Sequence, residues 1–166
     1  MDGTMEFAGG AILVGVGATA VLDLWSLGRA RFSAAPSPDY GLVGRWLAYL
    51  PRGRFFHRPI SASAPVRNEG LIGWTAHYLI GMGFAAILLA IYGLDWLRHP
   101  TLLPAMLVGI ASVSAPFLLM QPGMGLGVAA SRTPNPAKSR LRSLITHAVF
   151  GIGLYAAGWL LHLAQP

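Results

Sequence analysis

Three ionisable side chains lie inside long apolar stretches of this 166-residue sequence: Asp23, His77 and His147. Placing such a group at the centre of a membrane helix costs about 2.5–3.5 kcal/mol, so these residues usually face the protein interior and have a partner. One carboxylate and two imidazoles can bind a divalent metal and leave a coordination position open. The same groups can instead pass protons, because histidine titrates near neutral pH.

Glycines lie one helical turn from both histidines: Gly73 and Gly81 beside His77, and Gly151 after His147. Helical residues four apart share a face, so a flat macrocycle would have room beside each imidazole. Haem or a chlorophyll-type pigment is therefore a third alternative. The fourth is structural: a bond between the carboxylate and a histidine that holds helices together, worth about 0.6 kcal/mol.

These chemistries require helices to hold the three residues, and the sequence provides four apolar stretches long enough to cross a bilayer. With 54% hydrophobic and 11% charged residues, the chain does not have the composition of an ordinary soluble domain. The apolar runs are continuous rather than alternating, which excludes a β-barrel. We therefore predict an all-α, polytopic membrane protein, a four-transmembrane-helix bundle forming a single domain over 1–166. The spans are expected at 7–28, 71–97, 102–120 and 143–163, with loops at 29–70 and 121–142.

Asp23, His77 and His147 are predicted to share a depth in the membrane. Each lies about four to six residues from the same end of its span, or roughly 6–9 Å at about 1.5 Å per residue. In an antiparallel bundle the first helix can neighbour both the second and the fourth. We therefore expect the three side chains to converge, with their polar atoms roughly 3–5 Å apart.

Positive charge is concentrated on one side of the predicted bundle. Of the twelve Lys and Arg residues, only Arg98 lies outside the two long loops. The positive-inside rule therefore predicts cytoplasmic loops and places both termini on the non-cytoplasmic side. The net charge of +6 then reflects membrane topology, and we expect no nucleic-acid partner. The chain has no cysteine, which excludes disulfides, thiolate ligands and a cysteine nucleophile.

The first loop contains a predicted helix of its own, from Pro38 to Leu50. Ser37-Pro38-Asp39 is typical of a helix start, and Pro51 and Gly53 provide a stop. The apolar residues between them recur at helical spacing and form one face. This short helix either lies in the cytoplasmic membrane interface or packs under the bundle. Three arginines in and after it are candidate contacts for anionic lipid headgroups: Arg45, Arg52 and Arg54.

The second loop contains Gly125-x-Gly127-x-x-Ala130, which superficially matches a dinucleotide-binding fingerprint. That motif requires a preceding strand, and here a membrane span precedes it, so we reject a dinucleotide site. The glycines are assigned to close helix packing or to a locally unwound segment. A weak anion site with Arg132 is the alternative. Pro116, just before this loop, is expected to kink the third helix or end its regular part.

The other histidines and two methionines have simpler expected roles. We expect His57, His99 and His162 to be solvated, because they lie in loops or at a helix end. Met120 and Met124 are expected to pack rather than to act as soft ligands. The sequence contains no G-x-S-x-G, H-E-x-x-H or P-loop motif, so it assigns no enzymatic reaction.

Four runs carry a resemblance to a known family: PSPDYGLVGRW at 36–46, GWTAHY at 73–78, ASRTP at 130–134 and RSLITH at 142–147. Together they resemble a bacterial family of small four-span inner-membrane proteins, domain of unknown function 2938. The resemblance extends over nearly the whole chain. It implies a multi-pass protein of the bacterial inner membrane with this four-span layout, and it implies no activity.

Two classes of function remain open. The first is a buried Asp/His/His site that handles a divalent metal, a porphyrin-type cofactor or protons. The second is a non-catalytic accessory or structural subunit, in which the buried polar residues serve only packing. The expected partners are the lipid bilayer with its anionic headgroups, and either further copies of the chain or a larger membrane complex.

Overall fold

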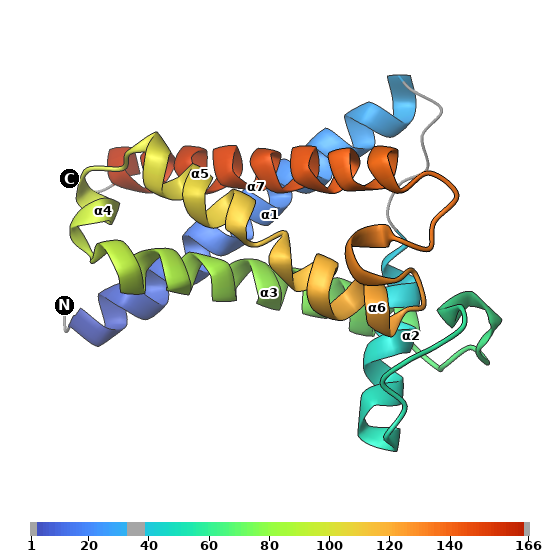
Figure 1. Cartoon of the computed structure of the whole chain (residues 1–166). Coiled ribbons are helices and arrows are strands. Elements are labelled where there is room, and N and C mark those ends of the chain that lie inside the picture. Colours follow the sequence, from blue (N-terminus) through green and yellow to red (C-terminus); the bar gives the residue numbers. More distant parts are fainter. Residues whose placement is uncertain (1–2, 33–38, 165–166) are drawn as a thin grey trace. The chain divides into compact units, whose positions relative to one another are not determined.

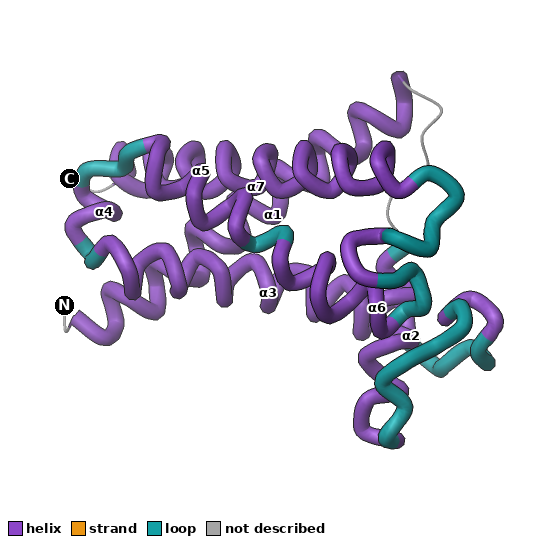
Figure 2. The backbone as a smooth tube through the Cα atoms, viewed as in Figure 1, coloured by secondary structure: helices purple, strands orange, loops and turns teal. Residues whose placement is uncertain are grey.

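The computed structural model describes residues 3–32 and 39–164, which are largely helical (Figure 1, Figure 2). Four helices in these ranges are long and apolar enough to cross a membrane, and neither range contains a strand. The predicted all-α architecture with four spans is therefore confirmed.

Three spans are single helices: α1 (Gly3–Phe32), α3 (Glu69–Tyr92) and α7 (Pro136–Ala164). The third span, Leu102–Gly123, combines α5 (Leu102–Ala111), the π-helical η3 (Pro116–Met120) and α6 (Gln121–Gly123). The shorter elements are α2 (Tyr40–Tyr49), α4 (Asp95–Arg98) and the 3-10 turns η1 (Leu50–Arg52), η2 (Ile60–Ala62) and η4 (Val128–Ala130).

The largest differences from the predicted span boundaries lie at the end of the second span and at the start of the fourth. The second span was expected to continue to residue 97, but α3 ends at Tyr92 because Gly93 adopts a left-handed φ of 79°. The last helix begins at Pro136, well before the expected residue 143. Proline is favourable at a first helical position, and the Asn135 side chain caps the helix by accepting a hydrogen bond from the Lys138 N–H at 3.0 Å. The second loop is therefore shorter than predicted.

Pro116 interrupts the third span, as predicted. The regular helix α5 ends at Ala111, residues 112–113 form a turn, and the π-helical segment begins at Pro116. Proline has no backbone N–H, and its ring clashes with the carbonyl four residues earlier, which here belongs to Ser112. The break in the helix lies at the residue where that clash would arise.

The described residues form two compact units. The first unit contains the described residues of Met1–Ser37, Tyr78–Ser112 and Ile145–Pro166, and the second contains those of Pro38–His77 and Val113–Leu144. The division passes through α3 and α7 and through the turn that follows α5. Each unit is therefore assembled from segments that are distant in the sequence.

Small residues bring the helices of the first unit together. A side chain at Gly15 would overlap the backbone of Met82, and one at Gly109 would overlap the backbone of Gly151. The second of these contacts lies where α5 runs beside α7 (Figure 1). Lipid provides no hydrophobic drive between helices, so close van der Waals contact of this kind must stabilise them.

One end of the first unit carries polar contacts. There α1 begins, α7 ends and α4 connects α3 to α5 (Figure 1). Arg98 of α4 donates to Glu6 of α1 at 3.1 Å and to Asp95 at 3.0 Å. The up-and-down course of the helices in this unit agrees with the predicted four-span layout.

The predicted loop helix forms α2 of the second unit. Asp39 caps it by accepting hydrogen bonds from the N–H groups of Gly41 and Leu42, whereas the predicted start at Ser37 and Pro38 lies outside the described residues. The helix ends through η1 and Gly53, which has a left-handed φ of 71°. A side chain at Gly44 would overlap the backbone of Glu69. Helix α2 therefore packs directly on the first turns of α3.

Candidate functional site

Asp23 of α1 forms a hydrogen bond with a tyrosine of the second span. The Tyr78 hydroxyl donates to Asp23 Oδ2 at 3.0 Å, and both residues are half-buried in the first unit. The apolar sequences around Asp23 and Tyr78 are sufficient to predict that both residues lie in membrane spans. That they are partners depends on how the two helices are rotated about their axes, which the sequence does not record. The predicted membrane carboxylate thus has a polar partner, as its cost in a membrane requires.

His147 of α7 also has a hydroxyl partner in the first unit. Its Nδ1 lies 2.6 Å from Ser112 Oγ, and Ser112 donates to the Gly109 carbonyl at 2.6 Å. Ser112 is 2% exposed and lies at the end of α5, where Pro116 disrupts the helical pattern. The break in the third span therefore places a hydroxyl group against the histidine.

His77 has its partner in the second unit. Its Nε2 lies 3.1 Å from the Tyr40 hydroxyl, and the two rings are stacked with centroids 4.3 Å apart. The Trp74 ring lies edge-on to His77, with centroids 5.8 Å apart. Tyr40 begins α2, so the loop helix supplies the partner of this histidine.

The glycines beside the histidines have neighbours that explain them. A side chain at Gly73 would overlap the Tyr40 carbonyl of α2, one at Gly81 would overlap Thr19 of α1, and one at Gly151 would press on Met106 of α5. These spaces are occupied by helices of the chain. The glycines therefore do not leave room for a macrocycle beside His77 and His147. Haem or pigment binding stays a prediction, and the glycine spacing no longer supports it.

The three predicted ligands do not all belong to one unit. Asp23 and His147 lie in the first unit and His77 lies in the second, so their convergence stays a prediction. Within residues 3–32 and 39–164, no group of three or more His, Asp or Glu residues is arranged to hold a metal ion. The observed feature that the three residues share is a hydroxyl partner within hydrogen-bond distance.

Arg45 bonds to groups of the protein itself, and headgroup binding by this residue stays a prediction. It donates to the Glu69 carboxylate through Nε at 2.8 Å and Nη2 at 2.7 Å, and through Nη1 to the Ser63 carbonyl at 3.0 Å. Glu69 also accepts from the Val66 N–H at 2.9 Å. The hydrogen bonds and charge of Glu69 raise the pKa of Arg45 above its usual value, so the guanidinium stays protonated. This ion pair fixes α2 and the first loop to the start of α3.

The other predicted basic residues are more accessible. Arg52 and Arg54 are exposed and lie over the Tyr49 ring at 5.3 Å and 5.7 Å from its centroid. Arg132 is exposed, and its backbone N–H donates to the Leu126 carbonyl. Headgroup or anion binding by these three residues stays a prediction.

The glycine run of the second loop serves a close approach between loops. Gly125 and Gly127 have left-handed φ values of 91° and 76°, and a side chain at Gly125 would overlap the His57 carbonyl. The preceding element is α6, a helical turn, whereas a dinucleotide fingerprint requires a strand at this place. A pocket of about 390 Å³ lies beside this run, lined by residues that include Gln121, Lys138 and Arg142 but not Arg132.

His57 is the functional candidate that sequence reasoning missed. It was expected to be solvated, but it is only 8% exposed, because the turn at Gly123–Gly125 covers it and its N–H donates to the Gly123 carbonyl at 2.9 Å. Its Nδ1 lies 2.8 Å from Ser63 Oγ, and its buried Nε2 has no hydrogen-bond partner. His99, by contrast, is exposed as expected. No spacing in the sequence pairs residues 57 and 123, so only the fold reveals this burial.

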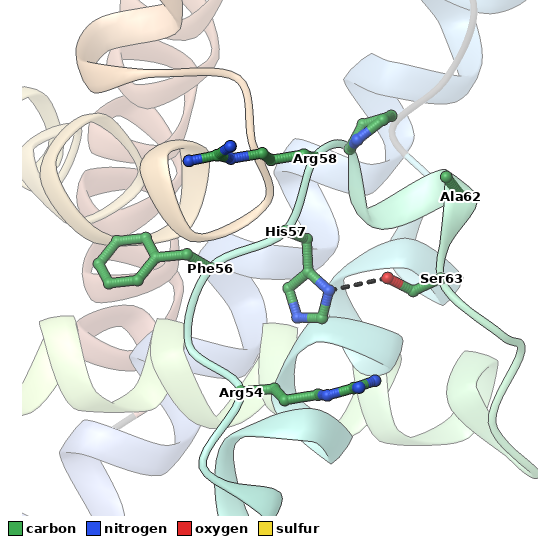
Figure 3. Close-up of a pocket in the computed structure, with 7 residues that line it drawn as sticks. Arg54, Phe56, His57, Arg58, Ala62 and Ser63 are labelled. Atoms are coloured by element: carbon green, nitrogen blue, oxygen red, sulfur yellow. Dashed lines mark hydrogen bonds between the residues drawn. The ribbon is translucent and has the colours of Figure 1, made fainter.

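His57 also lines a basic pocket of about 420 Å³ (Figure 3). The other residues that line the pocket include Arg54, Phe56, Arg58 and Ser63. The dashed line in Figure 3 marks the contact between His57 and Ser63. All of these residues belong to the second unit. The pocket thus combines two guanidinium groups, a hydroxyl and an imidazole without an acidic side chain in its lining.

Comparison with known proteins identifies the family. A family model described as "Protein of unknown function (DUF2938)" matches residues 12–161. The chain belongs to this family. The resemblance inferred from the sequence is therefore confirmed, and the DUF2938 match includes every hydroxyl-paired residue described above as well as the His57 pocket. Neither a curated protein nor a solved structure matches the chain.

Proposed function

We propose that this four-span membrane protein handles protons, with Asp23 and His147 as the groups that take up and release them. The observation that supports this proposal is the pairing of each ionisable side chain with a hydroxyl group, at 3.0 Å for Asp23 and 2.6 Å for His147. A hydroxyl both donates and accepts hydrogen bonds, so it suits either protonation state of its partner. Ionisable residues within membrane spans commonly belong to proton or ion pathways.

The hydrogen-bond directions assign a role to each ring nitrogen of His147. Ser112 donates its proton to the Gly109 carbonyl, so its oxygen accepts a hydrogen bond from the Nδ1–H of His147. Nε2 is then the nitrogen that binds and releases a proton. Ser112 acts as a positioning residue, since it fixes the tautomer and the orientation of the ring.

Asp23 complements this histidine with a carboxylate. The Tyr78 hydroxyl donates to Oδ2 and so orients the carboxylate. Metal or porphyrin binding by the same residues has less support, because the glycine spaces contain neighbouring helices and the described ranges contain no arrangement of three ligands for a metal. Proton handling requires neither feature.

Proton flux into liposomes tests the proposal. The purified protein is reconstituted with a trapped pH indicator, and a potassium diffusion potential drives protons inward. We expect flux above that of protein-free liposomes, and a several-fold loss of that flux in Asp23→Asn and His147→Gln at equal amounts of inserted protein. Asp95→Asn and His99→Gln, at exposed positions of the same unit, serve as matched controls and should retain it.

Two outcomes would contradict proton handling. The first is wild-type flux equal to that of protein-free liposomes, and the second is full flux in both site variants. If Asp23→Asn instead lowers only the amount of inserted protein or its melting temperature, the polar pairs have a structural role. That result would favour the alternative of a non-catalytic accessory or structural subunit, which should copurify with its host at a fixed ratio.

We also propose a bacterial inner-membrane location with both termini on the non-cytoplasmic side. The concentration of Lys and Arg in the two loops and in the helix ends beside them supports this orientation, because segments with an excess of Lys and Arg stay in the cytoplasm. Reporter fusions in the first loop test it. Activity of a periplasmic reporter placed between residues 52 and 67, with a cytosolic reporter silent there, would reverse the orientation.

A further inference from the structure

The pocket around His57 has the chemistry of a phosphate site. Arg54 and Arg58 are two of its lining residues, and no acidic side chain lines it. Neither arginine forms an ion pair within residues 3–32 and 39–164. Guanidinium groups bind phosphate oxygens through two parallel N–H donors, so two arginines without an acidic partner at one pocket favour an anionic ligand of this geometry.

His57 adds a buried donor to the two arginines. When the Ser63 hydroxyl donates to Nδ1 at 2.8 Å, the proton of the neutral ring lies on Nε2, which is buried and has no acceptor. Buried polar atoms are almost always hydrogen-bonded, and an orphaned one calls for an explanation such as a missing ligand. A phosphate oxygen would supply the acceptor that His57 lacks.

Hydrogen bonds tie the pocket to the end of a membrane span. The His57 N–H donates to the carbonyl of Gly123, the last residue of the third span, and the Ile60 N–H donates to the Met124 carbonyl at 3.0 Å. The end of a span lies at the depth of the lipid headgroups. A pocket fixed to that point is therefore positioned to meet a headgroup phosphate.

Two aromatic side chains next to the pocket indicate a lipid rather than a soluble phosphate. Phe55 is 55% exposed and Phe56 is 77% exposed, although both are large and apolar. Exposed aromatic rings beside basic residues are typical of segments that lie in a membrane interface. The combination of phosphate donors and apolar rings matches the two parts of a phospholipid.

We propose that Arg54, His57 and Arg58 form a binding site for the phosphate group of an anionic phospholipid. Ser63 acts as a positioning residue that orients the imidazole, and Phe55 and Phe56 contact the acyl region. The site is independent of proton handling at Asp23 and His147, which belong to the other unit.

Native mass spectrometry of the full-length protein tests this site. The protein is released from micelles that contain equal amounts of phosphatidylglycerol and phosphatidylcholine, and the retained lipid is counted. We expect one phosphatidylglycerol to be retained in preference, and Arg54→Gln/Arg58→Gln to weaken its binding at least about tenfold. The matched control, Arg31→Gln/Arg67→Gln, removes the same charge at exposed positions outside the pocket and should change binding less than about twofold.

The remaining arms separate the sources of phosphate and guard against misfolding. Inorganic phosphate and glycerol 3-phosphate are added without lipid; saturable binding of either one, with no preference for phosphatidylglycerol, would overturn the lipid assignment. If the double variant fails to fold, Arg58→Lys replaces it, and an intermediate loss is expected because lysine keeps the charge but lacks the planar fork. Equal weakening in the pocket variant and the control, or no binding of any of the three probes, would overturn the site itself.

Discussion

The two units share close approaches at glycines and differ in how their other segments are held. In the first unit, helix backbones approach closely at Gly15 beside Met82 and at Gly109 beside Gly151. The second unit also has such an approach, at Gly44 beside Glu69, but its loop is held by side chains that bond to backbone carbonyls, as when the Tyr49 hydroxyl donates to Ala64 and Trp46 Nε1 donates to Phe55. The difference follows the solvent that each set of residues is expected to meet. Helices in lipid depend on shape, while loops at a span end depend on directional hydrogen bonds.

The few polar side-chain contacts of the first unit therefore require a separate reason. Asp23–Tyr78 and Ser112–His147 lie in a unit whose core is formed by apolar side chains. In the second unit the Arg45–Glu69 pair has an evident structural role, since it anchors a loop to a helix. Substitutions at the two membrane pairs therefore test proton handling, and a substitution at the Arg45–Glu69 pair tests how the loop is anchored.

The largest expected effect on stability comes from a substitution that disrupts the packing of the first unit. Gly15→Leu places a side chain against the Met82 backbone, which cannot move aside as a flexible side chain can. We expect the free energy of unfolding to fall by about 3 kcal/mol or more, at the upper end of overpacking costs. Thermal unfolding of the detergent-solubilised protein measures this.

Gly83→Leu is the matched control for that substitution. Gly83 lies on an exposed face of α3, and an added Cβ would meet nothing within 4 Å. This variant should unfold near the wild-type temperature. Equal destabilisation by both leucines would mean that the loss comes from helix propensity or insertion, and not from contact between helices.

The next effect acts on the second unit through its ion pair. Glu69→Gln replaces an acceptor of two guanidinium bonds and one backbone N–H with a group that accepts through a single oxygen. We expect the first loop to loosen, with trypsin cleavage after Arg52 and Arg54 accelerated several-fold. The first unit contains none of these bonds, so the amide protons of its buried residues should stay protected in hydrogen exchange.

Asp95→Asn provides the comparison for the Glu69 variant. It breaks the Arg98–Asp95 pair, whose side chains are 52% and 87% exposed, compared with 11% and 23% for Arg45 and Glu69. Exposed ion pairs contribute little to stability. If Asp95→Asn loosens the protein as much as Glu69→Gln does, the distinction between the two pairs is wrong.

The smallest effect on stability is expected at a polar pair of the first unit. Tyr78→Phe removes the hydrogen bond to Asp23, and bonds of this kind between membrane helices average about 0.6 kcal/mol. Proton flux should nevertheless fall, while Tyr92→Phe in the same helix should alter neither quantity. A large loss of stability with unchanged flux would assign Asp23 and Tyr78 to structure.

Much of the fold follows from the hydropathy of the sequence and from the residues that start and stop helices. Long apolar runs are sufficient to predict four spans, and Asp39 and Gly53 mark the ends of α2 and its 3-10 extension. The end of α3 was less predictable, because apolar residues continue past Gly93 and only its left-handed φ stops the helix. Sequence patterns therefore predict which segments are apolar, but they predict the end of a helix only where residues such as proline or a capping aspartate mark it.

The site was predictable in its residue types and not in its partners. The cost of a charge in lipid singles out Asp23, His77 and His147, but their observed hydroxyl partners depend on helix rotation and on the break at Pro116. His57 lies in a polar loop, where sequence predicts exposure. Its burial arises from contact with a segment more than sixty residues away, and single-sequence patterns carry no information on such contacts.

The division of the chain into units has a consequence for biosynthesis. Both segments of the second unit have been translated once the ribosome passes Leu144, whereas the first unit still lacks Ile145–Pro166. Domains generally fold as their segments emerge. The glycine faces of α1 and α5 must therefore wait in the membrane for the last half-helix, exposed to lipid or to the insertion machinery. A chain cut short and released after Leu144 would keep both segments of the second unit and leave the bundle open, the form that membrane quality-control proteases are suited to remove.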